Sequence, residues 1–240
     1  MDCSIGAGEL VGMRLGVAAM AMAPAAATGK VSASLCMNCQ VRTRCIGGIA
    51  AEAGTVQLQG VLTGRRTLRV REVLDRPDEE FDTVYAVRSG ALVSVDERDG
   101  QVLGFHFPGE VVGADGMASG GQAVSLRAME DTQVCALRFA PRAGDAAGVR
   151  ALLSRLWDMV SCELVRERAH QALMATLPPQ RRVAAFLASA AARMRGRNPL
   201  RLPPGLVGGE IASYLHVSPE AVAAVLESGL PFGRRPGAPS

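Results

Sequence analysis

The sequence predicts an α+β protein with an antiparallel β-domain, then one long helix, then a small helical unit. Three observations predict this order. Short alternating apolar runs broken by turn residues fill residues 55–139, a helix-period pattern without glycine or proline runs from Val149 to about Leu177, and two further helical segments follow. With 240 residues, 48% of them hydrophobic, the chain is long enough for two domains with cores of their own.

Residues 1–34 are predicted to be a flexible leader. Residues 13–27 imitate a signal peptide only weakly, because Asp2 and Glu9 precede them and alanine rather than leucine dominates their apolar part. No apolar run reaches the ~20 residues of a membrane-spanning helix. We therefore expect a cytoplasmic protein with no membrane partner. The aromatic content of 4% also argues against a single-strand nucleic-acid surface of stacked rings.

The β-domain is predicted over residues 55–147. The runs 83–88 and 91–96 alternate on either side of Ser89 and Gly90, which is typical of a hairpin. Asp99 and Gly100 predict another turn before a strand at 101–107. Many short strands at this spacing indicate an antiparallel sandwich or barrel.

The long helix is predicted over residues 148–177 and carries an apolar repeat. Leu153, Trp157, Val160, Leu164 and Glu167 follow one another at alternating four- and three-residue steps, which is the seam of a two-stranded coiled coil. The alternative is an ordinary helix packed on its own β-domain. In a symmetric dimer Glu167 would lie near its own copy, and the repulsion of two carboxylates would make the dimer marginal.

The helical unit is predicted over residues 178–240. Pro178 and Pro179 end the long helix, and a second amphipathic segment runs from Gln180 to about Met194. Residues 208–215 and 218–226 then predict a helix, a tight turn and a helix. Ser218 is a good N-cap for the last helix, with Glu220 in its first turn.

Three of the six cysteines, Cys36, Cys39 and Cys45, fall within ten residues. At this spacing several thiolates can turn toward one centre, and sulfur donors select zinc, copper(I) or an iron-sulfur cluster. A zinc site usually has a second Cys-x-x-Cys or His pair, which is missing here, whereas three local cysteines and a distant one are common for a cluster with four iron corners. Cys135 is the distant candidate, although a lone cysteine in a strand is more often a small core residue.

Residues 84–91, 104–113 and 130–135 follow these cysteines. In this order and spacing, the chain from about 35 to 226 resembles the oxygen-sensing FNR branch of the Crp/Fnr transcription regulators. The resemblance implies a cysteine-rich cluster loop at 35–54, a cyclic-nucleotide-binding-like β-roll as sensory domain, a dimerisation helix and a winged helix-turn-helix. It also implies a [4Fe-4S] cluster held by Cys36, Cys39, Cys45 and Cys135.

The function that the resemblance implies is regulatory and not enzymatic. The cluster would respond to oxygen or redox state and control dimerisation and promoter binding. The implied partners are a second copy of the chain, double-stranded DNA and RNA polymerase. A cyclic nucleotide is not expected, because residues 121–128 lack an arginine at the place where related proteins hold the phosphate.

The predicted DNA-reading end departs from the FNR pattern of Glu, two residues, Ser-Arg. The resemblance places Ser218, Glu220, Ala223 and Ala224 at the DNA, with the two alanines where serine and arginine are expected. Losing an arginine-to-guanine contact costs roughly 1–3 kcal/mol of discrimination. Because no strand pair for a wing follows, the helix-turn-helix is predicted to be truncated. The alternative function is therefore a redox or metal-binding module that acts through protein contacts.

The cluster loop departs from the pattern at Arg44, where relatives commonly carry an apolar residue. A cation near a thiolate-bound cluster lowers the cost of its negative charge, and polar neighbours admit water. The sequence therefore predicts a cluster that is more sensitive to oxygen than a shielded one.

Overall fold

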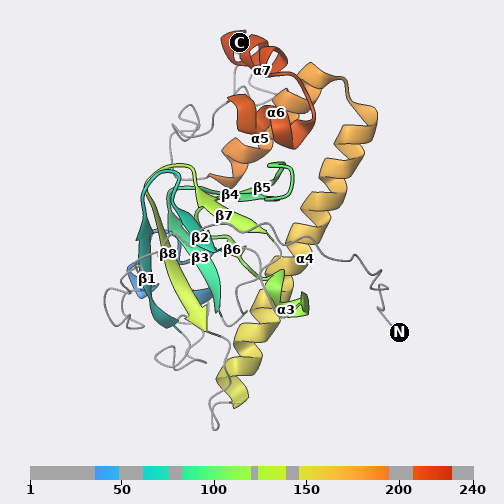
Figure 1. Ribbon diagram of the computed structural model, residues 1–240. Coiled ribbons are helices and arrows are strands. Elements are labelled where there is room, and N and C mark those ends of the chain that lie inside the picture. The colour runs from blue at the N-terminus through green and yellow to red at the C-terminus, as the bar shows by residue number, and fades with distance from the viewer. Residues whose placement is uncertain are drawn as a thin grey trace, which may run out of the picture.

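The computed structural model describes residues 36–48, 62–75, 83–119, 124–138, 146–194 and 208–228 (Figure 1). The predicted leader, residues 1–34, lies outside this part of the chain, as does any wing after residue 228. In the described part, no helix is both long and apolar enough to cross a membrane.

Two four-stranded antiparallel sheets form the β-roll and confirm the predicted class. In the first sheet the order is β1 (Leu62–Leu68), β8 (Thr132–Arg138), β3 (Thr83–Ser89) and β6 (Val111–Val112). In the second it is β2 (Val73–Asp75), β7 (Ser125–Ala128), β4 (Leu92–Val95) and β5 (Val102–His106). Buried side chains from both sheets, among them Leu68, Val87, Leu92, Leu126 and Val134, fill the space between them.

One predicted hairpin is wrong and the other is confirmed. Strands β3 and β4 flank Gly90 but belong to different sheets, so this turn carries the chain across the roll. Gly90 has a φ of +86°, and a Cβ there would lie 2.3 Å from Oγ1 of Thr132, so only glycine fits this crossing. Gly100, with φ +74°, closes the expected hairpin between β4 and β5.

Helix α4 (Ala146–Thr176) is 31 residues long, or about 46 Å at 1.5 Å per residue. A short helix, α3 (Gly116–Ser119), precedes it. At its far end Pro178 and Pro179 stop α4 and begin α5 (Pro179–Arg193), because proline tolerates the first position of a helix but not its interior. The predicted helix, turn and helix follow as α6 (Gly208–Leu215) and α7 (Pro219–Glu227).

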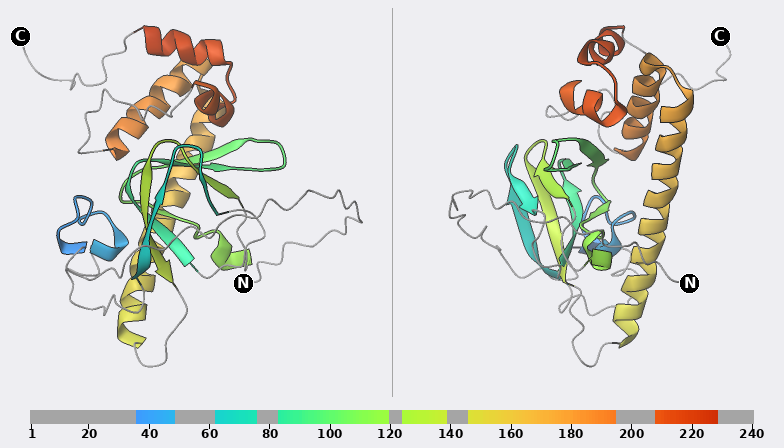
Figure 2. Two further views of the ribbon diagram at one scale, coloured as in Figure 1. Left: turned by 60° about the vertical axis from the view of Figure 1, so that its left-hand side comes forward. Right: turned by 45° about the vertical axis from the view of Figure 1, so that its right-hand side comes forward.

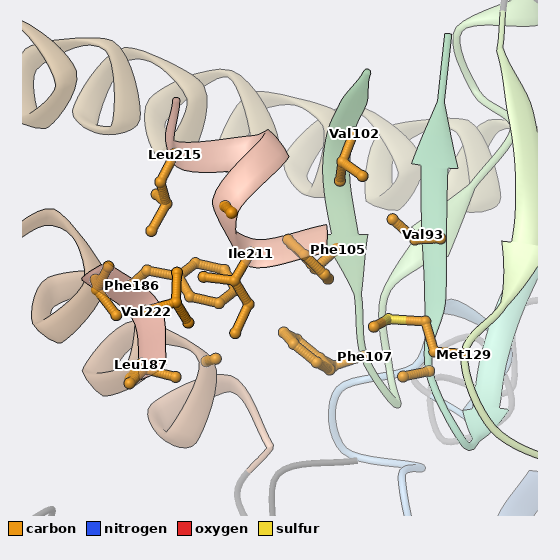
Figure 3. Packing of buried hydrophobic residues seen from close by; sticks show 14 of the residues in the cluster. Val93, Val102, Phe105, Phe107, Met129, Phe186, Leu187, Ile211, Leu215 and Val222 are labelled. Atoms are coloured by element: carbon orange, nitrogen blue, oxygen red, sulfur yellow. The ribbon is translucent and has the colours of Figure 1, made fainter. Parts of the chain in front are cut away.

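The C-terminal helices share one core with the β4–β5 hairpin. Figure 2 shows α5, α6 and α7 gathered beyond the β-roll at one end of α4. Figure 3 shows Phe105 and Phe107 facing this helical unit. The ring of Phe105 lies 5.0 Å from that of Phe186 in α5 and 5.2 Å from that of Tyr214 in α6, centroid to centroid. The apolar residues buried on the helical side are Val183, Phe186, Leu187, Ala190, Met194, Ile211, Ala212, Leu215, Val222 and Val225.

Candidate functional site

The four predicted cysteines line one pocket. Three come from the cysteine loop, residues 36–48, and the fourth, Cys135, comes from the centre of β8. All four are free thiols. The pocket has a volume of about 20 Å³, which is room for little more than one water molecule.

The cysteine loop is held between the first sheet and α4. Its backbone turns back on itself, as the amide of Cys39 bonds the carbonyl of Cys36 and the amide of Cys45 bonds that of Val41. Ile46 is fully buried and packs with Val41 against the β3–β8 pair and Leu156 of α4. This apolar anchor turns the sulfurs toward the sheet.

Cys135 is positioned by strand pairing. In the register of the first sheet it lies between Arg65 of β1 and Ala86 of β3. Arg65 and Arg88 also line the pocket, and the Arg65 side chain hydrogen-bonds the Cys135 thiol. The sequence alone did not indicate these two arginines, because the pairing of β1, β3 and β8 brings them to the thiols from distant positions.

Burial favours the protonated form of Cys36, Cys45 and Cys135. Burial raises the pKa of Cys45 to about 11, although the backbone amides of Gly47 and Gly48 donate hydrogen bonds to its sulfur and lower the pKa in part. Burial also raises the pKa of Cys36, and the neighbouring Cys135 and Cys39 raise it further. The pKa of Cys135 is raised by burial as well, while Arg65 opposes the rise. Any metal that binds here must therefore displace protons.

The two glycines after Cys45 leave space where the loop is tightest. A Cβ on Gly48 would lie 2.2 Å from the carbonyl oxygen of Arg42, which the backbone could not accommodate. A Cβ on Gly47 would touch the sulfur of Cys36 at 3.5 Å. Glycine at position 48 therefore lets the loop close over Cys45, whereas a Cβ at position 47 would make only an ordinary contact.

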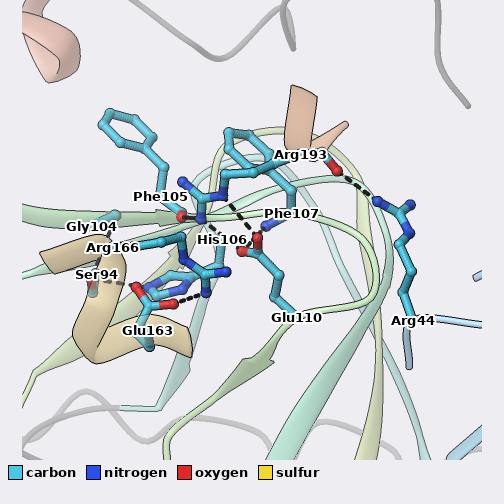
Figure 4. A network of polar contacts seen from close by, with 10 residues as sticks. All are labelled: Arg44, Ser94, Gly104, Phe105, His106, Phe107, Glu110, Glu163, Arg166 and Arg193. Atoms are coloured by element: carbon cyan, nitrogen blue, oxygen red, sulfur yellow. Dashed lines mark hydrogen bonds and ion pairs between the residues drawn. The ribbon is translucent and has the colours of Figure 1, made fainter. Parts of the chain in front are cut away.

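Arg44 does not line the thiol pocket, contrary to the role that the sequence suggested for it. Its Nη1 donates a hydrogen bond of 2.7 Å to the carbonyl oxygen of Arg193, the last residue of α5 (Figure 4). The arginines that line the pocket are Arg42, Arg65 and Arg88, and the last two lower the pKa of Cys36 and Cys135 against the larger effect of burial.

The described residues hold no group of three or more His, Cys, Asp or Glu side chains arranged for a single metal ion. A tetrahedral zinc ion with Zn–S bonds of about 2.3 Å would need its sulfurs within about 4 Å of one another. The four sulfurs share a pocket but do not form such a group.

The predicted DNA-contacting residues lie at the start of α7. Glu220, Ala223 and Ala224 are exposed on one side of the helix, while Val222 and Val225 are buried on the other. Ser218 is the N-cap, and its hydroxyl accepts a hydrogen bond from the amide of Ala221 at 3.3 Å. Ser218 therefore starts the helix, and its hydroxyl is already engaged.

The apolar repeat of α4 divides into two parts. The exposed fractions are 73% for Trp157, 51% for Leu164, and 41% each for Leu153 and Val160. Glu167 instead faces the helical unit of its own chain. It accepts a hydrogen bond from Gln171 and lines an open cavity of about 490 Å³ between α4, β5 and α6.

Arg127 makes a polar contact between the β-roll and the helical unit. Its Nη2 donates to Oε1 of Glu210 in α6 at 3.0 Å. Ser213 of α6 accepts a hydrogen bond of 3.0 Å from the amide of Val102 in the β4–β5 hairpin. The helical unit is thus fixed to the second sheet by polar as well as apolar contacts.

Known proteins match most of this chain. The cyclic nucleotide-binding domain family matches residues 65–140. The transcriptional activator protein Anr of Pseudomonas protegens is 32% identical over 197 residues, covering 79% of this chain and 80% of that protein. The fumarate and nitrate reduction regulatory protein of Escherichia coli K12 is 25% identical over 196 residues, covering 80% of this chain and 78% of that protein.

Solved structures agree with these relatives. FixK2 from Bradyrhizobium japonicum is 28% identical with a TM-score of 0.56, covering 68% of this chain and 82% of that one. A CRP/FNR family regulator from Thermus thermophilus has the same fold at 22% identity and a TM-score of 0.52, covering 68% of this chain and 84% of that one. The chain therefore belongs to the Crp/Fnr family of transcription regulators.

Proposed function

We propose that this chain is an oxygen- or redox-responsive transcription regulator that binds a [4Fe-4S] cluster through Cys36, Cys39, Cys45 and Cys135. The observation that carries the proposal is the meeting of these four sulfurs in one pocket, although one of them comes from a strand about 90 residues after the loop. Four thiolates are the usual ligand set of such a cluster.

The donor set of the pocket fits the cluster. The amides of Gly47 and Gly48 at the sulfur of Cys45, together with Arg65 and Arg88, favour a negatively charged centre. A cluster of four irons would fill more than the about 20 Å³ open between the thiols, so the thiol side chains would turn, or the cysteine loop would shift, to hold it. When bound, the cluster would supply a group that oxygen can degrade, and the protein would supply the four sulfurs, the charge balance and the shielding.

The cluster is proposed to act on dimerisation through α4. Leu156 faces the cysteine loop, and the next residue, Trp157, is exposed about 100° further around the helix. A movement of the cysteine loop would therefore shift α4. This helix would present its exposed apolar side chains to a second copy of the chain, namely Leu153, Trp157, Val160 and Leu164. Because an exposed apolar stripe of this kind favours a coiled-coil partner, a few kcal/mol from the loop could shift the equilibrium.

Reconstitution tests the cluster. Anaerobic incubation of the purified chain with iron and sulfide should give about four irons and four sulfides per chain, with a visible absorbance that decays in air. Cys135→Ser should lose most of the iron, whereas Cys162→Ser should not, because Cys162 is exposed on α4 away from the pocket. Equal iron in the two variants would contradict the assignment of Cys135.

A second function, a redox module that signals through protein contacts, is favoured by one observation. The exposed side of α7 carries alanine at positions 223 and 224, so it presents methyl groups where base contacts are expected. A gel-shift selection from random duplexes with the reconstituted protein distinguishes the two functions. An enriched sequence supports the regulator, and a loaded cluster with no enrichment supports the protein-contact module.

A further inference from the structure

We propose that Arg44 is a positioning residue that carries the state of the cysteine loop directly to α5, the first helix of the helical unit, within one chain. This route is separate from dimerisation through α4. It rests on the proposed function only for the nature of the signal, since the contacts themselves belong to the protein without a cluster.

The first step is the contact between Arg44 and the end of α5. The carbonyl of Arg193 is among the last of the helix and has no partner within it, so a cation at this end complements both the free carbonyl and the helix dipole. Arg44 supplies that cation at 2.7 Å, across 149 positions of the chain.

The second step is the support beneath Arg44. Gly109 packs against the side chain of Arg44. Its φ is +96°, and a Cβ at this position would lie 3.0 Å from Cβ of Arg44. Gly109 and Glu110 are pinned to β3, because the amide of Gly109 bonds the carbonyl of Val87 and the amide of Val87 bonds the carbonyl of Glu110. The stem of Arg44 therefore crosses a rigid turn on its way to α5.

The third step is the fixed side chain of Arg193. Its Nε and Nη2 each donate to Glu110 at 2.8 Å, and Nη2 also donates to the carbonyl of Phe105 at 2.5 Å (Figure 4). Its guanidinium lies 4.7 Å from the centre of the Phe107 ring. The β-roll thus binds the side chain of Arg193, while the cysteine loop binds its backbone carbonyl. A movement of the loop would therefore displace the backbone at the end of α5 while the side chain of Arg193 stays bound to the β-roll.

The fourth step is the link between Arg44 and the thiols. Arg44 directly precedes Cys45, and both amides bond the carbonyl of Val41, so the two residues form one turn. Their side chains point to different places, Cys45 into the thiol pocket and Arg44 to α5. A movement of Cys45 on loading would also move Arg44, because the two Cα atoms are only about 3.8 Å apart.

Hydrogen exchange of the apo protein, followed by mass spectrometry, tests the linkage without a cluster. In Arg44→Leu we expect the amides of the last turn of α5, residues 190–194, to exchange about five- to tenfold faster than in the wild type. Arg44→Lys should remain near the wild type because it keeps a donor and a charge. Arg98→Leu is the control for a lost arginine, since Arg98 is 90% exposed and pairs with Asp96 in the β4–β5 turn.

Loading the cluster tests the direction of the signal. Wild-type protein reconstituted with iron and sulfide should change its exchange at residues 190–194, and Arg44→Leu with the same iron content should not. Unchanged exchange in apo Arg44→Leu, or an equal response to loading in both proteins, would overturn the linkage. If no cluster forms in the wild type, the proposed function fails, and the apo comparison still decides the linkage.

Discussion

Removing the Arg193 side chain should destabilise the protein far more than removing a surface ion pair. The side chains of Arg193 and Glu110 are only 18% and 15% exposed and share two hydrogen bonds of 2.8 Å. Arg193→Met leaves the Glu110 carboxylate buried with no opposite charge and also frees the carbonyl of Phe105. Breaking a buried pair from one side costs about 3–5 kcal/mol of unfolding free energy.

Urea denaturation followed by circular dichroism measures this loss, with Arg155→Met as the control. Arg155 pairs with Asp158 on the surface of α4, and its removal should cost about 0.5 kcal/mol or less. Removing both charges, in Arg193→Met with Glu110→Met, should restore part of the stability because no buried charge is then left alone. If Arg193→Met costs no more than Arg155→Met, or if the double variant is less stable than Arg193→Met, the reasoning is refuted.

The same pair predicts an acid dependence. Burial alone would raise the pKa of Glu110, but the hydrogen bonds and charge of Arg193 and the amide of Phe107 outweigh it and lower the pKa below 4.5. A carboxyl whose pKa is lower in the folded state contributes stability above about pH 4.5 that is lost as the pH falls through the folded-state pKa. The stability of Arg193→Met should therefore depend less on pH in this range than that of the wild type.

Three further changes test the core, the helix seam and the thiol pocket. Burial lowers the pKa of His106 below 6.5, so at falling pH the unfolded chain takes up a proton before the folded chain does. The free energy of unfolding should therefore fall as the pH drops below 6.5. In urea titrations at several pH values, His106→Gln should show a smaller fall. The charged groups that face this ring are Glu110, Glu163, Arg166 and Arg193. Trp157→Glu should leave the loaded protein monomeric in sedimentation, whereas Glu167→Ala should leave the dimer almost unchanged because Glu167 faces its own helical unit. A dimer of loaded Trp157→Glu would contradict the seam. Arg65→Met should make the reduction potential of the cluster more negative by removing a nearby positive charge, and Arg44→Leu should leave it almost unchanged, because Arg44 bonds Arg193 instead.

The sequence predicted the elements better than their contacts. Local patterns were enough for α4 and for the α6–α7 pair, where Ser218 and Pro219 mark the start of the last helix as expected. The turn at Gly90 was misread because a glycine with positive φ serves a crossing between sheets as well as a hairpin, and only the pairing partners distinguish the two. The position of Arg44 was misjudged for a similar reason, since its partner is 149 residues away.

The candidate site was predictable where the residue type carries the information. Four cysteines in a recognisable order could be assigned to one centre, and their side chains line one pocket. The arginines that set the charge of the pocket could not be predicted from the sequence. Arg65 and Arg88 lie beside Cys135 only because the strands pair in the order β1-β8-β3. Arginine is common in this chain, so nothing local distinguishes these two from the others.

The position of the cysteine loop limits how a signal can leave it. The helical unit shares a core with the β4–β5 hairpin, so it cannot swing freely while Phe105 stays packed between Phe186 and Tyr214. A movement of the loop can act on α4 through the packing of Leu156 and Met159, or on α5 through Arg44. In the proposed mechanism, the first route would change the face of α4 offered to a second copy, and the second would change the end of α5, which packs against α7. Both routes begin within a few residues of Cys45, so one event at the thiols can alter pairing and DNA reading together.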